Sequence, residues 1–231
     1  MKNYNQVSSG RLTAGLMFCL MLCALLAWPG CAWFSEETEK TADELIQDGM
    51  TAFEAGKYRK SLESFEKIKD WYPFSKYAPL AELKTADAHF KLKEYEDATF
   101  SYESFENLHP RNEAIPYVVY QIGMCHFNRI EAVDRDQSFT RSALNIFSRL
   151  IRAHPENEYA QNAEKHLVTC RKHLAGHEFY VGEFYYKGGH CKSAVTRFKT
   201  IIDNYPEMDD LYKKAQNYIR TCNEKMLNTE S

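Results

Sequence analysis

The feature that most constrains this 231-residue chain is a short phrase, a tyrosine or a histidine followed by proline, that occurs four times. Each copy follows an amphipathic stretch such as SALNIFSRLIRA. Because proline lacks an amide hydrogen and restricts the residue before it, each phrase predicts the end of a helix. The four copies are Tyr72-Pro73, His109-Pro110, His154-Pro155 and Tyr205-Pro206. The chain is therefore expected to fold as a series of similar helical units.

Within each amphipathic stretch, a small residue precedes an aromatic residue by four positions, and an apolar residue follows three places later. Residues at i and i+4 share one helix face, so the small and the large side chain can pack knob against notch. The pairs are Ser61/Phe65, Ala98/Tyr102, Ala143/Phe147 and Ala194/Phe198, followed by Ile68, Phe105, Leu150 and Ile201. This is the pattern of the second helix of a tetratricopeptide repeat (TPR), in register four times.

A TPR also needs a first helix with a small residue where the aromatic side chain arrives. Gly49, Ala86 and Gly182 occupy that place in repeats one, two and four. In repeat three Gly123 lies eight residues too early, which predicts an insertion near Glu131–Ser138. The extra length before the last proline is helical in pattern, and it predicts one long helix over residues 159–187.

The sequence thus predicts an all-α, TPR-type helical-hairpin solenoid with about four repeats and a C-terminal capping helix. Few glycines (10) and prolines (7) agree with helices, and packing between repeats accounts for an aromatic content of 14%. Stacked helix pairs leave an extended concave surface that binds other proteins. The predicted array covers residues 41–227, with repeats at about 42–75, 79–112, 116–157 and 159–208 and a cap at 209–226.

The N-terminus carries an export signal rather than a part of the fold. Lys2 and Arg11 precede an apolar run over residues 12–27, and Gly30-Cys31 follows shortly after that run. A small residue before cysteine at this place resembles the bacterial lipobox. We expect cleavage of residues 1–30, lipid attachment to Cys31 and a polar tether over residues 31–40.

Two features of this junction qualify the lipobox resemblance. Trp28 and Pro29 stand where the usual lipobox has leucine and a small residue. An uncleaved anchor helix and ordinary signal cleavage therefore stay open as alternatives. Ala32 follows the cysteine, and alanine there is compatible with transfer to the outer membrane.

The charge balance and the motifs exclude several function classes. The chain has 29 basic and 32 acidic residues, a net charge of −3, so it lacks the basic excess that nucleic-acid binding uses. Neither glycine-rich phosphate loop, GxGxxG or GxxxxGK[ST], occurs in it. We expect no enzyme activity and no cofactor apart from the covalent lipid on Cys31.

A row of histidines and a cysteine is the strongest metal candidate in the sequence: His166, Cys170, His173 and His177. Along one straight helix these four would span about 16 Å, too far to reach one ion. We expect no metal site, although an enzyme that uses this row stays open as an alternative. Cys125, Cys170, Cys191 and Cys222 are expected mostly as buried thiols, and whether any pair forms a disulfide stays open.

Several phrases beyond the plain TPR pattern resemble the BamD (ComL) family of outer-membrane lipoproteins, a component of the β-barrel assembly machinery. The likeness covers about residues 41–206. The phrases are YPFSKY at 72–77, YVVYQIG at 117–123, DRDQ at 134–137, NEY at 157–159, EFYY at 183–186 and AVTRF at 194–198. The chain departs from the family in its short C-terminal end and in Cys191, which replaces an aromatic residue.

The resemblance implies a lipid-anchored scaffold of the outer membrane that faces the periplasm. Its C-terminal repeats would hold the periplasmic domains of the barrel-forming subunit, and its N-terminal groove would accept unfolded outer-membrane protein segments. Arg197, off the core stripe of the last repeat and within the AVTRF phrase, is the candidate partner-binding residue. The alternative is a different periplasmic TPR lipoprotein, an adaptor for cell-wall or envelope-constriction enzymes.

Overall fold

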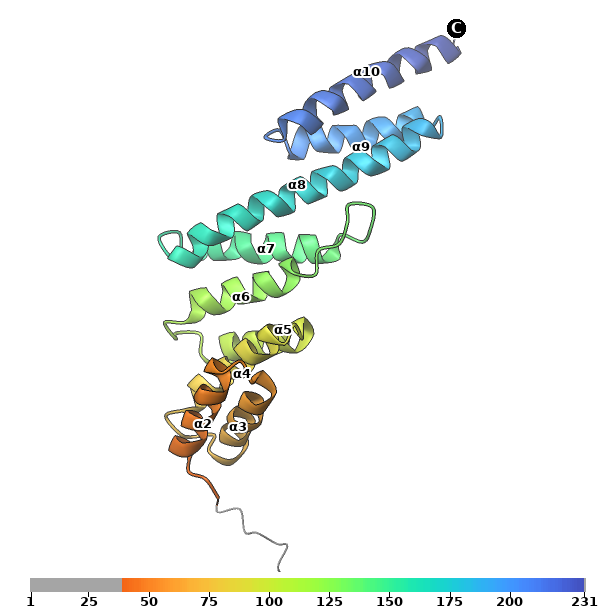
Figure 1. Ribbon diagram of the computed structural model, residues 1–231. Coiled ribbons are helices and arrows are strands. Elements are labelled where there is room, and N and C mark those ends of the chain that lie inside the picture. Colours follow the sequence, from red (N-terminus) through yellow and green to blue (C-terminus); the bar gives the residue numbers. More distant parts are fainter. Residues whose placement is uncertain (1–38, 231) are drawn as a thin grey trace, which may run out of the picture. The chain divides into compact units, whose positions relative to one another are not determined.

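The computed structural model describes residues 39–230, and all regular secondary structure in that range is helical. Each helix packs against the next one along the chain, α8 also contacts α6 and α10, and Figure 1 shows the resulting stack of helix pairs. The helices are α2 (Ala42–Glu54), α3 (Tyr58–Trp71), α4 (Ala78–Lys91), α5 (Tyr95–Leu108), α6 (Ile115–Phe127), α7 (Ser138–Ala153), α8 (Glu158–Lys187), α9 (Cys191–Asn204) and α10 (Asp209–Glu230).

This architecture confirms the predicted all-α TPR-type solenoid. Four hairpins, α2/α3, α4/α5, α6/α7 and α8/α9, are followed by α10 as the cap. The long helix begins one residue before the predicted start, where Asn157 caps it by accepting the amide of Tyr159 at 2.9 Å. The capping helix continues to Glu230, four residues past the predicted end at Met226.

The four prolines end the second helices as predicted. The residue before each proline donates its amide to the carbonyl four residues earlier, at 2.9 Å in every repeat, and then leaves the helical conformation. The donors and acceptors are Tyr72 and Ile68, His109 and Phe105, His154 and Leu150, and Tyr205 and Ile201. The second helix of every repeat therefore ends in the same way.

Glycine lets the two helices of a hairpin approach closely in three of the repeats. A Cβ atom on Gly49 would lie 2.4 Å from the ring of Phe65, and one on Gly123 would lie 2.4 Å from the ring of Phe147. A Cβ atom does not come that close to a non-bonded heavy atom, so an alanine at either position would displace the ring. In repeat four Gly182 and Phe198 are related in the same way, at 2.7 Å.

The inserted segment lies between α6 and α7, as the shifted register predicts, and it is bound to the helices beside it. His177 of α8 donates its Nδ1 hydrogen to the carbonyl of Val133 at 2.6 Å. The buried amide of Gln137 donates to the carbonyls of Ala132 and Arg135 at 3.0 and 3.1 Å. These bonds satisfy backbone groups of a segment that has no regular structure of its own.

The described part of the chain contains no helix that is both long and apolar enough to cross a membrane. The predicted signal peptide and Cys31 lie outside the described residues.

Candidate partner-binding site

Arg197 lies on α9 and bridges to the preceding helix. Its Nη1 donates to Oε2 of Glu178 on α8 at 3.1 Å. The arginine side chain is 42% exposed, whereas that of Glu178 is 12% exposed. The guanidinium is therefore open on one side and held on the other by a carboxylate of its own chain.

A second arginine stands near this pair. Arg171 of α8 forms an ion pair with Glu207 and donates to the carbonyl of Asn204 at 2.6 Å. Its guanidinium carbon lies 5.2 Å from the ring centre of Tyr205. Burial raises the pKa of Tyr205, and the nearby charge of Glu178 raises it further. Tyr205 thus lies close to both ion pairs and joins them into one surface.

We call this surface the C-terminal polar surface; it consists of Arg171, Glu178, Arg197, Tyr205 and Glu207. Half-exposed arginines can add a forked hydrogen bond to a carboxylate of another protein. Arginine and tyrosine are also the side chains that most often dominate the binding energy of protein interfaces. The surface is suited to binding another protein.

Sequence reasoning found Arg197 but missed its partner. Glu178 falls on the otherwise apolar stripe of the long helix, which includes Cys170 and Leu174. A carboxylate on such a stripe needs a cation to compensate its burial. That requirement was the available signal for an ion pair, and the structure supplies it from the next helix.

The row of histidines and cysteine on α8 does not come together as one site. His166 Nε2 lies 3.1 Å from the hydroxyl of Tyr120, its ring stacks on Phe147, and burial lowers its pKa. Cys170 is fully buried, and burial raises the pKa of its thiol to about 12. His177 bonds the inserted segment instead. These three groups have different surroundings, and a buried thiol with a raised pKa is a poor nucleophile.

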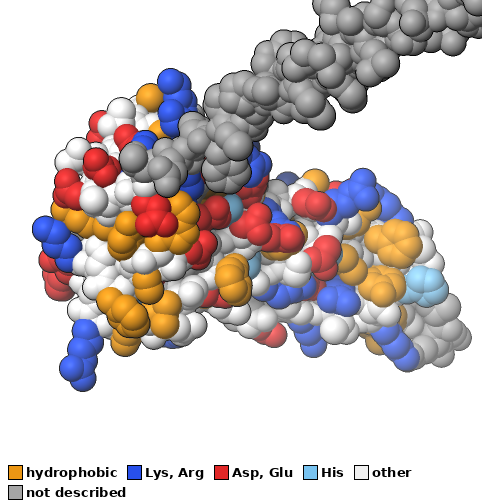
Figure 2. Space-filling model, turned by 90° about the horizontal axis from the view of Figure 1, so that it is seen from below, with side chains coloured by type: hydrophobic (Ala, Val, Ile, Leu, Met, Phe, Trp, Pro, Cys, Tyr) orange, Lys and Arg blue, Asp and Glu red, His pale blue; other side chains and the backbone are white. Residues whose placement is uncertain are grey.

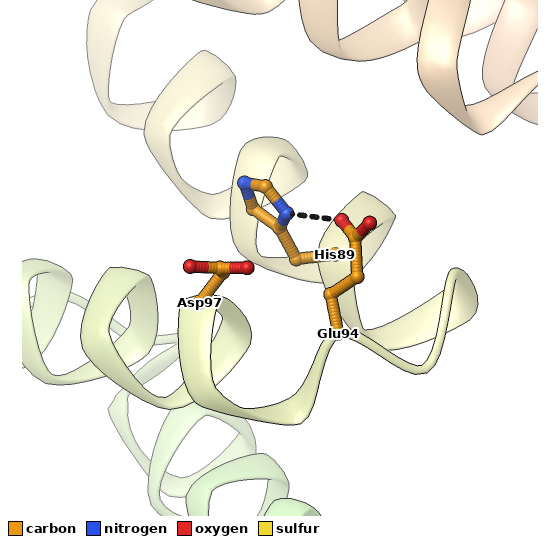
Figure 3. Close-up of side chains that lie close together, drawn as sticks. All are labelled: His89, Glu94 and Asp97. Carbon is orange, nitrogen blue, oxygen red and sulfur yellow. Dashed lines mark hydrogen bonds and ion pairs between the residues drawn. The ribbon is translucent and has the colours of Figure 1, made fainter.

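Within residues 39–230, one group of three side chains has ligand atoms all within 4.8 Å of one another: His89, Glu94 and Asp97. Figure 3 shows the ring of His89 directed at Glu94, with Asp97 in the first turn of α5. His89 Nδ1 donates to Glu94 Oε2 at 2.9 Å, and Arg59 of α3 pairs with the same carboxylate. The histidine bond, followed by the Arg59 charge, lowers the pKa of Glu94. These bonds already compensate the carboxylate and tie repeat one to repeat two.

Comparison with known proteins gives consistent results. Residues 38–230 match the YfiO family, which is described as outer membrane lipoprotein. The outer membrane protein assembly factor BamD of Rickettsia prowazekii is 32% identical over 179 residues, which cover 76% of this chain and 71% of that protein. BamD of Caulobacter vibrioides is 28% identical over 167 residues, 72% of this chain and 55% of that protein.

BamD of Neisseria gonorrhoeae is 27% identical over 175 residues, which cover 71% of this chain and 66% of that protein. The matched segments thus span between about half and three quarters of these relatives. Because the family match takes in every helix from α2 to α10, this chain belongs to the YfiO family of outer membrane lipoproteins, the family of its BamD relatives.

Proposed function

We propose that this chain is a scaffold of the machinery that assembles outer-membrane β-barrel proteins. As a member of its family it is non-catalytic, and its chemistry is the binding of other proteins. The observation that carries the proposal is the family match over the whole helical array, together with names of relatives that refer to outer membrane protein assembly. The extended stack of hairpins supports it, since such stacks present long binding surfaces.

The C-terminal polar surface is the proposed docking site for the periplasmic domains of the barrel-forming subunit. Arg197 supplies the half-exposed cation, and Tyr205 supplies an aromatic side chain beside Arg171. The partner would present a carboxylate to the guanidinium. Glu178 holds the arginine in place before the partner arrives, which reduces the conformational freedom lost on binding.

Arg197→Ala is the test of this docking site. Loss of a close charge pair at an interface costs roughly 2–5 kcal/mol, or about 30-fold or more in Kd. We expect that loss when binding to the isolated periplasmic domains is measured by calorimetry. Alanine is a cleaner probe than glutamate, because a glutamate at this position would face Glu178.

Two further variants separate partner binding from stability. Arg149, on α7, pairs with Glu106 and is 43% exposed, so Arg149→Ala is a matched control that should leave the Kd unchanged. Glu178→Gln keeps the arginine and removes its intramolecular charge, and it should retain binding. If Arg197→Ala binds like the wild type, the docking site is wrong; if the wild type does not bind, the proposed function fails.

The first two repeats are the proposed receiving surface for unfolded outer-membrane protein segments. Five large apolar side chains are exposed there: Trp71, Phe74, Leu80, Phe100 and Leu108. Figure 2, the view from below, shows separate hydrophobic patches among charges of both signs. Dispersed apolar contacts suit unfolded segments of varied sequence, since each patch can bind one side chain at a time.

Phe74→Ser tests this receiving surface. Phe74 is fully exposed, so the substitution should leave the melting temperature unchanged. Burial of one phenylalanine by a ligand contributes about 1.5–3 kcal/mol, so binding of a urea-unfolded barrel protein should weaken by about tenfold or more. Phe184→Ser, an exposed phenylalanine on α8, is the control and should bind normally. Equal binding by both variants would contradict the assignment.

A lipid on Cys31 is the proposed anchor of the scaffold in the outer membrane, with the helical array in the periplasm. The support is the apolar run over residues 12–27 and the Gly30-Cys31 pair that follows it. Cys31→Ser should release the protein from membranes or leave its signal uncleaved. A variant that stays in the outer-membrane fraction with the mass of the wild type would contradict lipidation.

A further inference from the structure

Two of the four described cysteines lie at the same place in the fold. Cys191 is the first residue of α9, and it packs against the apolar cluster in which Cys222 of α10 is fully buried. The two helices run antiparallel and pack along their lengths (Figure 1). The ring of Phe198 stacks on that of Tyr218 with centres 4.8 Å apart, which fixes the register. Cys191 precedes Phe198 on α9, and Cys222 follows Tyr218 on α10. In an antiparallel pair, both cysteines therefore lie on the same side of the stacked rings.

The surroundings of the two thiols place them next to each other. The ammonium of Lys225 donates to the hydroxyl of Tyr186 at 3.0 Å, and Cys191 and Cys222 both add to the rise in its pKa. Burial raises the pKa of Cys222 to about 11, and a hydrogen bond with Cys191 adds to the rise. Cys191 and Cys222 therefore belong to one apolar cluster and lie near the same cationic side chain.

The other two cysteines have different surroundings. Cys125 and Cys170 belong to the central apolar cluster, which is formed by repeats two and three and the start of α8. Burial raises the pKa of Cys125 to about 12, and the side chains that modify it further are those of Thr99, Arg129 and Glu103. No other cysteine contributes to the rise in the pKa of either thiol. The chain thus contains its own controls for any cysteine chemistry at α9 and α10.

We propose that Cys191 and Cys222 form an intramolecular disulfide that fastens the capping helix to the last repeat. The oxidant is a protein or small-molecule disulfide, of the kind found outside the cytoplasm. The thiolate of the partly exposed Cys191 attacks a sulfur of that disulfide and displaces one thiolate. The buried Cys222 then gives up its proton and attacks the sulfur of Cys191, displacing the second thiolate. The oxidant gains two electrons and two protons and becomes two thiols.

The position explains what the bond would do. Among the described helices, α10 contacts α9 and, less extensively, α8. Helices with few packed neighbours open more readily than helices at the centre of a core. A cross-link between α9 and α10 restricts that opening. This inference concerns the stability of the cap and does not depend on the proposed partners.

The experiment is oxidation of the reduced, purified full chain with oxidised glutathione, followed by peptide mapping under non-reducing conditions. We expect one cross-linked pair of peptides, containing Cys191 and Cys222 and lighter than the reduced peptides by two hydrogen atoms. Cys125 and Cys170 should be recovered as free thiols after unfolding and alkylation. A lasting glutathione adduct on Cys191, or a bond to any other cysteine, would overturn the proposal.

Variants make the result specific. Cys191→Ser should abolish the cross-link, whereas Cys170→Ser should retain it. Oxidation should raise the melting temperature of the wild type and of Cys170→Ser but not that of Cys191→Ser. Because Cys191 is only partly buried, its serine variant should fold even if Cys222→Ser does not. A melting temperature that does not change on oxidation of the wild type would show that the bond does not hold the cap, against the proposal.

Discussion

Repeat two and the other three repeats meet the same packing requirement with different residues. In repeats one, three and four, a phenylalanine ring lies against a glycine of the first helix. In repeat two, Ala86 stands at the glycine position and Tyr102 at the phenylalanine position, and both are fully buried. The tyrosine hydroxyl donates to Oδ1 of Asp87, next to Ala86 on α4, at 2.7 Å. Repeat two thus has a polar link where the others have apolar contact alone.

The buried carboxylate connects three helices. Tyr117 of α6 also donates to Oδ1 of Asp87 at 2.7 Å, and Lys84 of α4 donates to Oδ2 at 2.8 Å. Burial, followed by the charge of Asp87, raises the pKa of both tyrosines, so their hydroxyls stay protonated as donors. Repeat two thus tolerates the methyl group of Ala86 and the hydroxyl of Tyr102, because a neighbouring carboxylate accepts the hydrogen bond of that hydroxyl.

The largest effect is expected from removal of an aromatic ring that lies on glycine. Phe147→Ala in repeat three empties a fully buried position, and such truncations cost about 3–5 kcal/mol. The measurement is chemical unfolding followed by helical circular dichroism. An unfolding free energy equal to that of the wild type would show that the repeat register is wrong.

An added methyl group tests whether repeat three requires the close approach of glycine and ring. Gly123→Ala would place a Cβ atom 2.4 Å from the Phe147 ring, and overpacking of this kind costs about 1–3 kcal/mol. Gly176→Ala is the control, because its Cβ would meet Val133 of the inserted segment at 3.2 Å. We expect thermal melting to show a clear loss for the first variant and little change for the second. Equal melting temperatures would mean that the close approach is not required.

The polar link of repeat two can be taken apart in two steps. Tyr102→Phe removes one hydrogen bond and should cost about 1 kcal/mol. Asp87→Ala leaves the buried Tyr102 hydroxyl without its acceptor, and a cost of about 1–3 kcal/mol follows. In the Tyr102→Phe background, Asp87→Ala should cost less than it does alone. Additive losses in this double-mutant cycle would show that the two groups do not interact.

The smallest effect concerns the turn of repeat two, which departs from the turns of repeats one and four. Gly56 and Gly189 turn the chain with φ of 72° and 78°, whereas repeat two has Lys93 with φ of 62°. A side chain in this left-handed region costs about 1–2 kcal/mol. Lys93→Gly should therefore stabilise the protein. Glycine also gives the unfolded chain more conformational freedom, which opposes folding, so the net gain should be at most about 1 kcal/mol. A lower melting temperature for this variant would contradict the turn assignment.

The sequence predicts the hairpins, their ends and the inserted segment because each depends on local patterns. Proline stops and the small and aromatic residues at i and i+4 are visible without a structure. The link from Tyr102 to Asp87 is not, because it joins two helices through side chains. A signal existed: a tyrosine at a buried aromatic position needs a partner for its hydroxyl.

The same limit applies to the candidate binding site. The place of Arg197 off the core stripe was predicted from helical spacing, and the structure finds the residue half-exposed. Its pairing with Glu178, and the neighbouring pair of Arg171 and Glu207, depend on how α8 and α9 cross, which spacing along one helix does not reveal. Helical periodicity orders residues on one helix and leaves their contacts across helices undetermined.

The most direct test of the central claim, that this chain is a scaffold of β-barrel assembly, is mild detergent extraction of the tagged protein from its own membranes. Mass spectrometry then identifies the outer-membrane proteins that co-purify. The account predicts that the barrel-forming subunit of the assembly machinery is recovered in near-equal amount, and that Arg197→Ala reduces its yield without loss of helical signal. Recovery of cell-wall hydrolases in the absence of that subunit would contradict the claim.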